Sequence, residues 1–364
     1  MNDDNTGMTD TIIPPGSTIG ILGGGQLGRM TALAAAPLGY QCLVFEPQEG
    51  CPASHVAPHI AASYDDRDAL ADFAEQVDVV TLEFENVPVD VLDFLAETVP
   101  VRPGSSVLSI AQDRKSEKTF LNEAGIETAP WAPVHDEASL ASAVTYVGRP
   151  SVLKSARLGY DGKGQTTLTP DTDPLDAWEA IGRTPAILEG FIDFTCEVSV
   201  IVARSPNGET ACFPTVMNDH KNHILYKTTA PAPVDAAIRE KAEQAALTAA
   251  RAFGVYGLLA VEMFVTPDGR ILANEVAPRP HNSGHWTIEG CRTSQFEQLV
   301  RAVCNLPLGD MSLRGRSEMI NLLGDDIDAW ADYLKQPNTH LHLYGKAEAK
   351  PGRKMGHITR VFDN

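Results

Sequence analysis

A regular alternation of short apolar runs and amphipathic segments near the start of the chain places the strongest constraint on its fold. The runs TIGILG, which begins at Thr18, QCLVFE and VDVVTLE have the length and composition of buried strands. Helical patterns over 26–38 and 65–76 separate them. Strands joined through helices run parallel in one sheet, with right-handed crossovers. The sequence therefore predicts a parallel α/β domain over 18–112, preceded by a polar, flexible tail over 1–17.

The middle of the chain has a different pattern, in which short strands are separated by glycine-rich turns. An alanine-rich helical stretch covers 234–253, and a shorter one covers 116–124. The strand-like runs lie at 150–156, 186–192, 197–203, 258–265 and 270–277. Strands joined by tight turns pair antiparallel, so we expect an α+β central domain over 113–312. A strand-like HLHLYG and a basic tail then predict a small C-terminal domain over 313–364.

Composition limits the kinds of partner. The 364 residues predict two or three domains, and a formal net charge of −19 argues against nucleic-acid and anionic-membrane binding. Anionic small molecules would need a local basic pocket. No apolar run reaches the roughly 18 residues of a membrane span, and the first residues do not resemble a secretory signal, so we expect a cytoplasmic protein. The six cysteines form no CxxC pair and are expected to be small buried hydrophobes.

The turn GGGQLG at 23–28 follows the first strand and opens the first helix. It fits the GxGxxG pattern, and Glu46 ends the next strand, where a dinucleotide site places its ribose carboxylate. Amides at that helix N-terminus could hold a phosphate or a carboxylate. A tight turn that lets helix and strand approach closely explains the same glycines. An NAD-dependent oxidoreductase therefore stays open as an interpretation.

A second glycine-rich segment, GYDGKGQ at 159–165, follows the strand that carries Lys154. Its three glycines leave the backbone free to fold its amides over a phosphate chain, which Lys154 and Lys163 would neutralise. The spacing differs from the GxxxxGK[ST] of a P-loop, so the segment would act as a flexible lid. A solvated hairpin is the alternative.

Glu262 and Glu275 lie on the two strands that flank Asp268 and Gly269. If these two residues form a two-residue hairpin loop, the glutamates are directly opposed, with Cβ atoms about 5 Å apart. Like charges that face each other among apolar neighbours repel unless a proton or a cation lies between them. Mg²⁺ held by both carboxylates and by substrate phosphates meets that demand. Two exposed strand carboxylates are the alternative.

The segment APRPHNSGHW at 277–286 follows directly. Its prolines fix a polar loop beside the expected metal, so Arg279, His281, Asn282 and His285 are candidate ligands for an anion or a substrate. His281 is also a candidate proton carrier, because the pKa of an ordinary histidine is near neutrality. A zinc site on His281 and His285 would need a helix, which the prolines oppose.

The segment 346–357 is strongly basic within an acidic chain. Between 346 and 360, five lysines and arginines face a single glutamate. A solvated face is the usual explanation of a charge run. Against a net charge of −19, a phosphate-binding patch explains this run better.

Together these motifs resemble the ATP-grasp superfamily, and within it the 5-(carboxyamino)imidazole ribonucleotide synthase family of bacterial purine biosynthesis. The resemblance rests on GGGQLGRM, TLEFENV, QDRKSEK, LKSARLGYDGKGQ, CEVSVIVAR, NEVAPRPHNSGHWT, SQFE and GRKMGH. It extends over about 19–360. Two features depart from the family pattern: the tail before Thr18 is longer than usual, and His223 stands where a glycine is common.

The resemblance implies a three-lobed ATP-grasp fold and an ADP-forming ligase. ATP and bicarbonate would give carboxyphosphate, which would carboxylate 5-aminoimidazole ribonucleotide to 5-carboxyaminoimidazole ribonucleotide. Mg²⁺, which Mn²⁺ could replace, would be the metal, and a homodimer would be the assembly. A biotin carboxylase, a formate-dependent transformylase and a non-catalytic nucleotide sensor stay open as alternatives.

By matching positions, the resemblance also assigns roles to individual residues. ATP would contact Arg114, Lys154, Gly159, Tyr160, Asp161, Gly162, Lys163, Gly164, Gln165, Glu189, Gly190, Phe191, Ile192, Glu197, His220, Asn274 and Glu275. The ribonucleotide would contact Gly25, Gln26, Leu27, Glu85, Tyr160, Asp161, Arg279, His281, Asn282, Ser283, Lys346, Arg353 and Lys354. The metal would be held by Glu262, Asn274 and Glu275. The chemistry would depend on Lys163, Arg279, His281 and Asn282.

Overall fold

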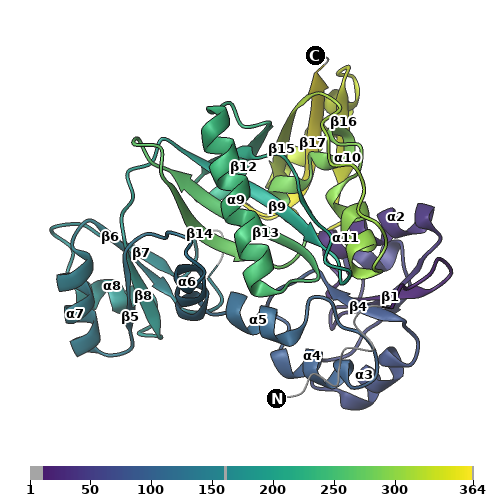
Figure 1. Cartoon of the computed structure of the whole chain (residues 1–364), viewed down its shortest axis with the longest axis horizontal. Helices are drawn as coiled ribbons and strands as arrows, with labels where there is room; N and C mark the ends of the chain where they lie inside the picture. The colour runs from purple at the N-terminus through teal and green to yellow at the C-terminus, as the bar shows by residue number, and fades with distance from the viewer. Residues whose placement is uncertain (1–10, 160–161, 363–364) are drawn as a thin grey trace.

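Three β-sheets organise the part of the chain that the structure describes, residues 11–159 and 162–362 of a computed structural model (Figure 1). One sheet belongs to the N-terminal domain and one to a small lobe at the left of the view. The largest sheet runs through the centre of the molecule into the C-terminal segment. The parallel and antiparallel parts expected from the sequence are both present.

The N-terminal sheet is parallel, as the alternation of strands and helices predicts. Its strands follow the order β3-β2-β1-β4 and comprise β1 Thr18–Leu22, β2 Gln41–Phe45, β3 His59–Ile60 and β4 Val79–Leu82. Its helices are α2 Gln26–Ala35, η1 Ala36–Leu38, η2 Pro52–His55, α3 Arg67–Ala74, α4 Val89–Ala96 and α5 Ser105–Ala111. Ile19 and Ile21 lie in a cluster with α2, whereas Leu22 lies in a cluster with α3 and α4. The strands are therefore buried on both faces.

The small lobe is an antiparallel sheet with two helices. Its strands follow the order β5-β8-β6-β7 and comprise β5 Trp131–Val134, β6 Ser151–Ser155, β7 Gln165–Leu168 and β8 Ala186–Gly190. Its helices are α7 Glu137–Val147 and α8 Pro174–Ala180, and α6 Arg114–Glu123 precedes them. The glycine-rich segment 159–165 ends at the first residue of β7 and lies in the connection from β6, and its residues 160–161 are outside the described part of the chain. The expected lid therefore lies at the end of a hairpin.

The large sheet follows the order β14-β13-β9-β11-β12-β15-β17-β16, with β10 paired to β9. Its central strands are β9 Cys196–Arg204, β10 Thr210–Cys212, β11 Val216–Lys221, β12 Ile224–Ala230, β13 Gly257–Val265 and β14 Ile271–Ala277. The associated helices are α9 Ala236–Phe253, η3 Asn282–Gly284, α10 Thr287–Gly290 and α11 Gln295–Val303. Ala242, Ala246 and Ala249 of α9 are fully buried in the cluster with β9 and β13, because small side chains let helix and sheet approach closely.

The C-terminal segment continues the large sheet and does not end in a tail. Its elements are β15 Arg316–Leu323, η4 Gly324–Ala329, α12 Trp330–Leu334, β16 Thr339–Leu343 and β17 Lys354–Phe362. β17 pairs with β15 on one side and with β16 on the other. The expectation of a basic tail after HLHLYG is therefore wrong for 354–362, where buried hydrophobic residues such as Met355 and Ile358 form a strand between two others.

Residues 11–17 are held against the fold. Ile13 is buried, its N–H donates to the carbonyl of Cys304 at 3.0 Å, and its own carbonyl accepts from the Tyr40 hydroxyl at 2.6 Å. The flexible tail expected over 1–17 is therefore wrong for 11–17, and residues 1–10 lie outside the described part of the chain.

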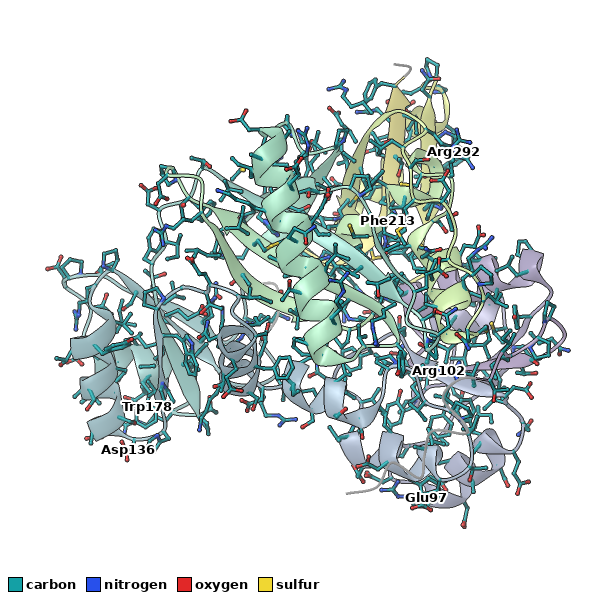
Figure 2. The ribbon with its side chains drawn as sticks, in the orientation of Figure 1. Glu97, Arg102, Asp136, Trp178, Phe213 and Arg292 are labelled. Carbon is teal, nitrogen blue, oxygen red and sulfur yellow. The ribbon has the colours of Figure 1, made fainter. Side chains whose placement is uncertain are left out.

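Buried contacts also join the N-terminal domain to the rest of the molecule. The side chain of Arg102, labelled in Figure 2, is 2% exposed and donates to the carbonyl of Val303 in α11 at 2.5 Å. The six cysteines are free thiols: four are buried and two are partly buried. Among the described helices, none combines the length and apolar composition needed to cross a bilayer.

Candidate active site

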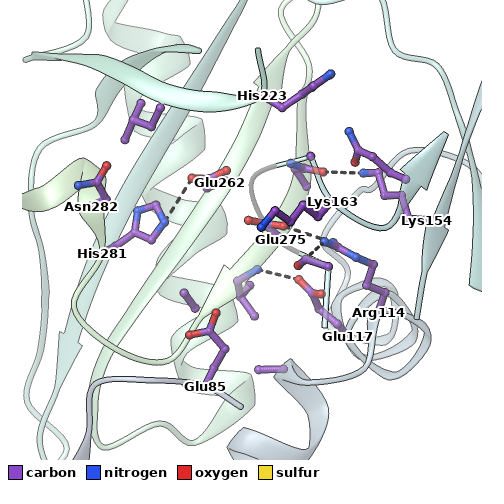
Figure 3. Close-up of a pocket in the computed structure, with 18 of the residues that line it drawn as sticks. Glu85, Arg114, Glu117, Lys154, Lys163, His223, Glu262, Glu275, His281 and Asn282 are labelled. Atoms are coloured by element: carbon purple, nitrogen blue, oxygen red, sulfur yellow. Dashed lines mark hydrogen bonds and ion pairs between the residues drawn. The ribbon is translucent and has the colours of Figure 1, made fainter. Parts of the chain in front are cut away.

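A cleft of about 1100 Å³ lies between the N-terminal domain, the small lobe and the large sheet (Figure 3). Segments from most of the motifs identified in the sequence border it. The candidate residues that line it are Gln26, Leu27, Glu85, Arg114, Lys154, Gly159, Gly162, Lys163, Gln165, Phe191, Glu197, His220, Glu262, Asn274, Glu275, Arg279, His281, Asn282 and Lys354. The fold thus brings both glycine-rich segments, the hairpin and the polar loop to one place.

Some candidate residues do not border this cleft. Within the described part of the chain these are Gly25, Glu46, Gly164, Glu189, Gly190, Ile192, Ser283, His285, Lys346 and Arg353. The side chain of His285 is fully buried, and its Nδ1 lies 3.0 Å from Gln295 Nε2. Tyr160 and Asp161 lie outside the described residues. Ser283, expected to contact the substrate, has a fully buried side chain whose hydroxyl lies 2.8 Å from both Ser199 Oγ and His281 Nδ1. Ser283 therefore orients the His281 ring from behind.

The hairpin opposes the two glutamates, but not through the expected loop. Val265 pairs with Ile271, one residue out of the register that a two-residue loop at 268–269 would give. A β-bulge further along the hairpin shifts the register back, so that Glu262 pairs with Glu275. The pairing inferred from the sequence is right, whereas the inferred loop is wrong, because the bulge compensates for the longer loop.

The bulge also decides which side chains face the cleft. Asn274 is the extra residue on β14, between Glu275, which pairs with Glu262, and Ala273, which pairs with Met263. Neighbours on a regular strand point to opposite faces, but a bulge re-aims one of them. Asn274 and Glu275 accordingly both line the cleft. Alternation alone would place only one of them there.

Cations of α6 and β6 contact these side chains from the small-lobe side. Arg114 NH1 lies 3.3 Å from Glu275 Oε2, and Lys154 Nζ donates to Asn274 Oδ1 at 3.4 Å (Figure 3). Arg114 NH2 also donates to the carbonyl of Gly159, at the start of the lid, at 3.4 Å. Arg114 therefore contacts both the start of the lid and β14, and Lys154 contacts β14 beside it.

Glu262 and His281 lie side by side on the other side of the cleft. Burial and the facing Glu275 raise the pKa of Glu262 to about 8. His281 Nε2 lies 3.3 Å from Glu262 Oε1, and burial together with Arg279 lowers the pKa of His281 to about 3. The near-neutral pKa expected for His281 is therefore wrong, because burial and the positive charge of Arg279 disfavour the protonated ring. A neutral imidazole is the form present at pH 7.

A buried ion-pair network lies behind the phosphate side of the cleft. Lys118 Nζ lies 2.7 Å from Glu189 Oε1, and Lys154 contacts the other oxygen of Glu189. Burial alone would raise the pKa of Glu189, but Lys118 and Lys154 lower it to about 2. Sequence reasoning missed Lys118 and its neighbour Glu117, since a polar run at a helix start is typical of a solvated surface. Burial also raises the pKa of Glu117, to about 7.

The glycine-rich turn of the N-terminal domain already holds an anion, which is the carboxylate of Glu83. Its Oε1 accepts from the N–H of Gly25 at 2.8 Å, and its Oε2 accepts from those of Leu27 and Gly28 at 3.1 Å each. Glu46 accepts from the N–H of Gly24 at 3.1 Å. These amides are therefore occupied by the protein itself, which argues against a dinucleotide pyrophosphate at this turn.

Arg279 reaches the cleft as one half of an ion pair. Its Nε contacts Glu85 Oε2, and its NH2 donates to Glu85 Oε1 at 2.8 Å. Burial would raise the pKa of Glu85, but Arg279 lowers it, so both groups stay charged. Asn282 is fixed by Asn321, to whose Oδ1 its Nδ2 donates at 3.0 Å. The polar loop thus presents side chains whose orientations are set by neighbours.

Of the three basic residues expected to bind the ribonucleotide phosphate, only Lys354 lines the cleft. Arg353 NH1 donates to the carbonyl of Glu348 in its own loop at 3.0 Å. Lys346 Nζ lies 5.6 Å from the ring centroid of Tyr344. The start of β17 therefore contributes one cation to the cleft.

Comparisons with known proteins agree with this arrangement. Family models match the ribonucleotide synthetase preATP-grasp domain at 17–112, the ATP-grasp domain at 119–296 and the phosphoribosylaminoimidazole carboxylase C-terminal domain at 317–364. The N5-carboxyaminoimidazole ribonucleotide synthase of Brucella melitensis is 52% identical over 357 residues, covering 97% of this chain and 99% of the relative.

Solved structures give the same result. The ADP complex of an N5-carboxyaminoimidazole ribonucleotide synthetase has a TM-score of 0.94 at 46% identity, covering 97% of this chain and 94% of the other. The Aspergillus clavatus synthase, in complex with ADP and 5-aminoimidazole ribonucleotide, has a TM-score of 0.89 at 35% identity, with 98% and 95% covered. This chain belongs to the N5-carboxyaminoimidazole ribonucleotide synthase family.

The position at which this chain departs from the family pattern faces the lid. His223 has φ +63°, in the left-handed region that favours glycine, and it lines the cleft. A Cβ placed on Gly162 would lie 2.7 Å from the Cβ of His223. The histidine thus fits here because the lid residue opposite has no side chain.

The hydrogen bonds of the Glu83 carboxylate to the turn at 23–28 should stabilise the N-terminal domain, and this can be tested by substitution. We expect Glu83→Gln to lower the free energy of unfolding by about 2–4 kcal/mol, because a neutral amide cannot accept from all three backbone N–H groups. Urea unfolding followed by circular dichroism measures the change. Glu46→Gln, which affects a single N–H of this turn, is the matched control and should cost less. Equal stability of Glu83→Gln and the parent protein would contradict the anchoring role.

Proposed function

We propose that this chain carboxylates 5-aminoimidazole ribonucleotide, with ATP and bicarbonate, to 5-carboxyaminoimidazole ribonucleotide in purine biosynthesis. The observation that carries the proposal is a single cleft that holds several basic groups and a pair of facing carboxylates. Arg114 and Lys154 contact Glu275 and Asn274, whereas Lys354 lines the same cleft and acts through its charge on Glu262 and His281. A nucleoside triphosphate and a second phosphorylated substrate need this distribution of charge. Relatives solved with ADP and with 5-aminoimidazole ribonucleotide support it.

ATP would occupy the side of the cleft nearest the small lobe. Arg114, Lys154 and the lid 159–165 would contact its phosphates, as the resemblance implies. Phe191 follows β8 and borders the cleft, so the 189–192 segment would face the adenine. Glu197 and His220, whose Oε1 and Nδ1 lie 3.1 Å apart, would contact the ribose end.

The carboxylate side chains fit a hard divalent cation such as Mg²⁺. Two carboxylates and an amide oxygen, from Glu262, Glu275 and Asn274, converge on the cleft, and Glu262 has a raised pKa because its burial and the facing Glu275 outweigh the lowering by His220 and Lys354. Among the described residues, no group of three or more histidine, cysteine or acidic side chains could hold a metal alone. These three residues would therefore hold it together with ATP phosphates, and the bound ion would offset charge on the transferring phosphoryl group.

Bicarbonate is a poor electrophile and must be activated. In the proposed reaction a bicarbonate oxygen attacks the γ-phosphorus of ATP, the bond to ADP breaks, and carboxyphosphate forms. The exocyclic amine of the ribonucleotide then attacks the carboxyl carbon, phosphate leaves, and the amine loses a proton. Arg279, kept charged by Glu85, and the neutral His281 would hold the intermediate between them.

Carboxyphosphate hydrolyses readily, so water must be excluded until the amine reacts. Gly162 of the lid and His223 lie next to each other at the border of the cleft, and together they would close over it. Asn282 and Lys163 would complete the enclosure around the reacting groups, and Gln26 and Leu27 would close the ribonucleotide side.

An ADP-release assay with each substrate omitted in turn tests this function. We expect the full rate only when ATP, bicarbonate and 5-aminoimidazole ribonucleotide are all present, because the chemistry needs all three. Equal turnover with a biotin substrate, or with formate and glycinamide ribonucleotide, would refute the assignment. We also propose a homodimer, as the resemblance implies, which light scattering of the purified chain would measure.

A further inference from the structure

β14 lies at the edge of the large sheet, so one side of its backbone lacks a neighbouring strand in that sheet. Such an edge exposes N–H and C=O groups that need partners. On β14 this side includes 273–276, the stretch that contains the bulge and presents Asn274 and Glu275 to the cleft. Whatever binds this edge also affects where these two side chains point.

At Ala273 this side is paired by an isolated parallel bridge to Thr128, and the Ala273 N–H donates to the carbonyl of Glu127 at 2.7 Å. Over 274–276, two side chains of α6 take the place of the missing strand. The carboxylate of Glu117 accepts from the N–H of Val276 at 2.7 Å (Figure 3). Lys118 Nζ donates to the carbonyl oxygen of Asn274 at 2.7 Å and lies 3.4 Å from that of Ala273. Glu117 is 2% exposed and Lys118 is 1% exposed, so bulk water could not replace them without opening the core. The backbone of the bulge is therefore held by one acceptor, the Glu117 carboxylate, and by one donor, the Lys118 ammonium group.

A bulge interrupts the ladder of hydrogen bonds, so the strand pairing alone does not fix it. A slip of one residue in pairing would turn an inward side chain to the other face. On this hairpin a slip would separate Glu275 from Glu262, since the bulge is what brings them into register. An external restraint on the backbone of 273–276 removes that freedom.

We propose that Glu117 and Lys118 are positioning residues that hold the β14 bulge in the conformation that aims both Asn274 and Glu275 at the metal. The inference rests on the proposed function, because it takes these two residues as ligands of Mg²⁺. Neither α6 side chain touches the metal in this account. Both act through the backbone of β14.

The test uses two substitutions at one position. Glu117→Gln keeps an oxygen that can accept from the Val276 N–H, whereas Glu117→Leu removes the acceptor at similar size. ADP binding to the full-length chain is measured by calorimetry, once with Mg²⁺ and once with EDTA. We expect Glu117→Leu to weaken ADP binding in Mg²⁺ by about 10- to 100-fold, as for other residues that orient metal ligands. In EDTA its affinity should match the parent protein, and Glu117→Gln should match the parent protein in both buffers.

Each other result counts against the proposal. Equal losses for Glu117→Gln and Glu117→Leu would mean that the negative charge acts directly. A parallel loss in Mg²⁺ and EDTA would mean a general distortion of the cleft, and no loss for Glu117→Leu would mean that the contact is dispensable.

Lys118→Met provides a second arm if Glu117→Leu does not fold. It removes the donor to the Asn274 carbonyl while Glu189 keeps Lys154 as a partner. We expect the same loss confined to Mg²⁺, and an equal loss in EDTA would overturn the proposal. ADP binding requires neither bicarbonate nor ribonucleotide. ADP release that ignores the ribonucleotide would therefore refute the proposed function and leave this test intact.

Discussion

Replacement of Glu275 by glutamine should lower kcat for ADP release by about 100- to 1000-fold, or roughly 3–4 kcal/mol of transition-state stabilisation. The substitution leaves Glu262 facing a neutral amide, and a single carboxylate binds Mg²⁺ more weakly than two. The fold should persist, because the change also removes the repulsion between two facing carboxylates. Steady-state kinetics over a range of Mg²⁺ concentrations, with circular dichroism of the same samples, measures both effects.

Glu127→Gln is the matched control for this substitution, since the Glu127 side chain is 64% exposed beside the same strand and lies outside the cleft lining. It should behave like the parent protein. Excess Mg²⁺ should restore part of the activity of Glu275→Gln, because the affinity for the ion is what the substitution lowers. Full activity of Glu275→Gln at ordinary Mg²⁺ would contradict the metal site.

Lys354→Ala should raise the KM for 5-aminoimidazole ribonucleotide by about 10- to 100-fold, because a charge-assisted contact to phosphate is worth roughly 1.5–3 kcal/mol. The KM for ATP should change little, since in this proposal Lys354 of the cleft lining contacts the ribonucleotide phosphate and not ATP. Arg353→Ala and Lys346→Ala should have smaller effects, because neither side chain borders the cleft. Initial rates with one substrate varied at a time give both constants.

Lys350→Ala is the control for net charge in this segment. Its side chain is 67% exposed and its Nζ is paired with Glu348, so its loss should change neither KM. A parallel rise in both KM values for Lys354→Ala, or no rise in either, would mean that the ribonucleotide phosphate binds elsewhere.

The elements of this fold follow from local patterns that the sequence displays directly. β1 and β2 appear as apolar runs, because a strand that is buried on both faces is apolar along its length. The helix between them appears as an amphipathic segment, because only one side of it is buried. The pairing of Glu262 with Glu275 was also predictable, but only because two deviations cancel. The longer loop and the bulge each shift the register by one residue, and no local pattern in the hairpin reveals either shift.

Contacts between distant segments were not predictable in this way. Glu83 ends a strand and fills the turn at 23–28, although the turn alone is equally suited to an external phosphate. Lys118 lies in a polar stretch of α6 and is nevertheless buried, because the edge of β14 and the carboxylate of Glu189, both distant in the sequence, surround it. Such placements depend on which elements meet in space, and a periodic pattern carries no information about that.

The continuity of the large sheet has a mechanical consequence for the order of events in the cleft. Glu262, Glu275 and Lys354 are all on strands of this one hydrogen-bonded sheet, so they form a fixed frame. Lys154 and the lid belong to a separate sheet in the small lobe, which can rotate as a unit about its connections. Opening of that lobe would weaken the contacts of Lys154 and the lid with the nucleotide. It would leave the distance between the carboxylate pair and Lys354 unchanged. Under the proposed function, nucleotide exchange would therefore leave the proposed ribonucleotide site intact.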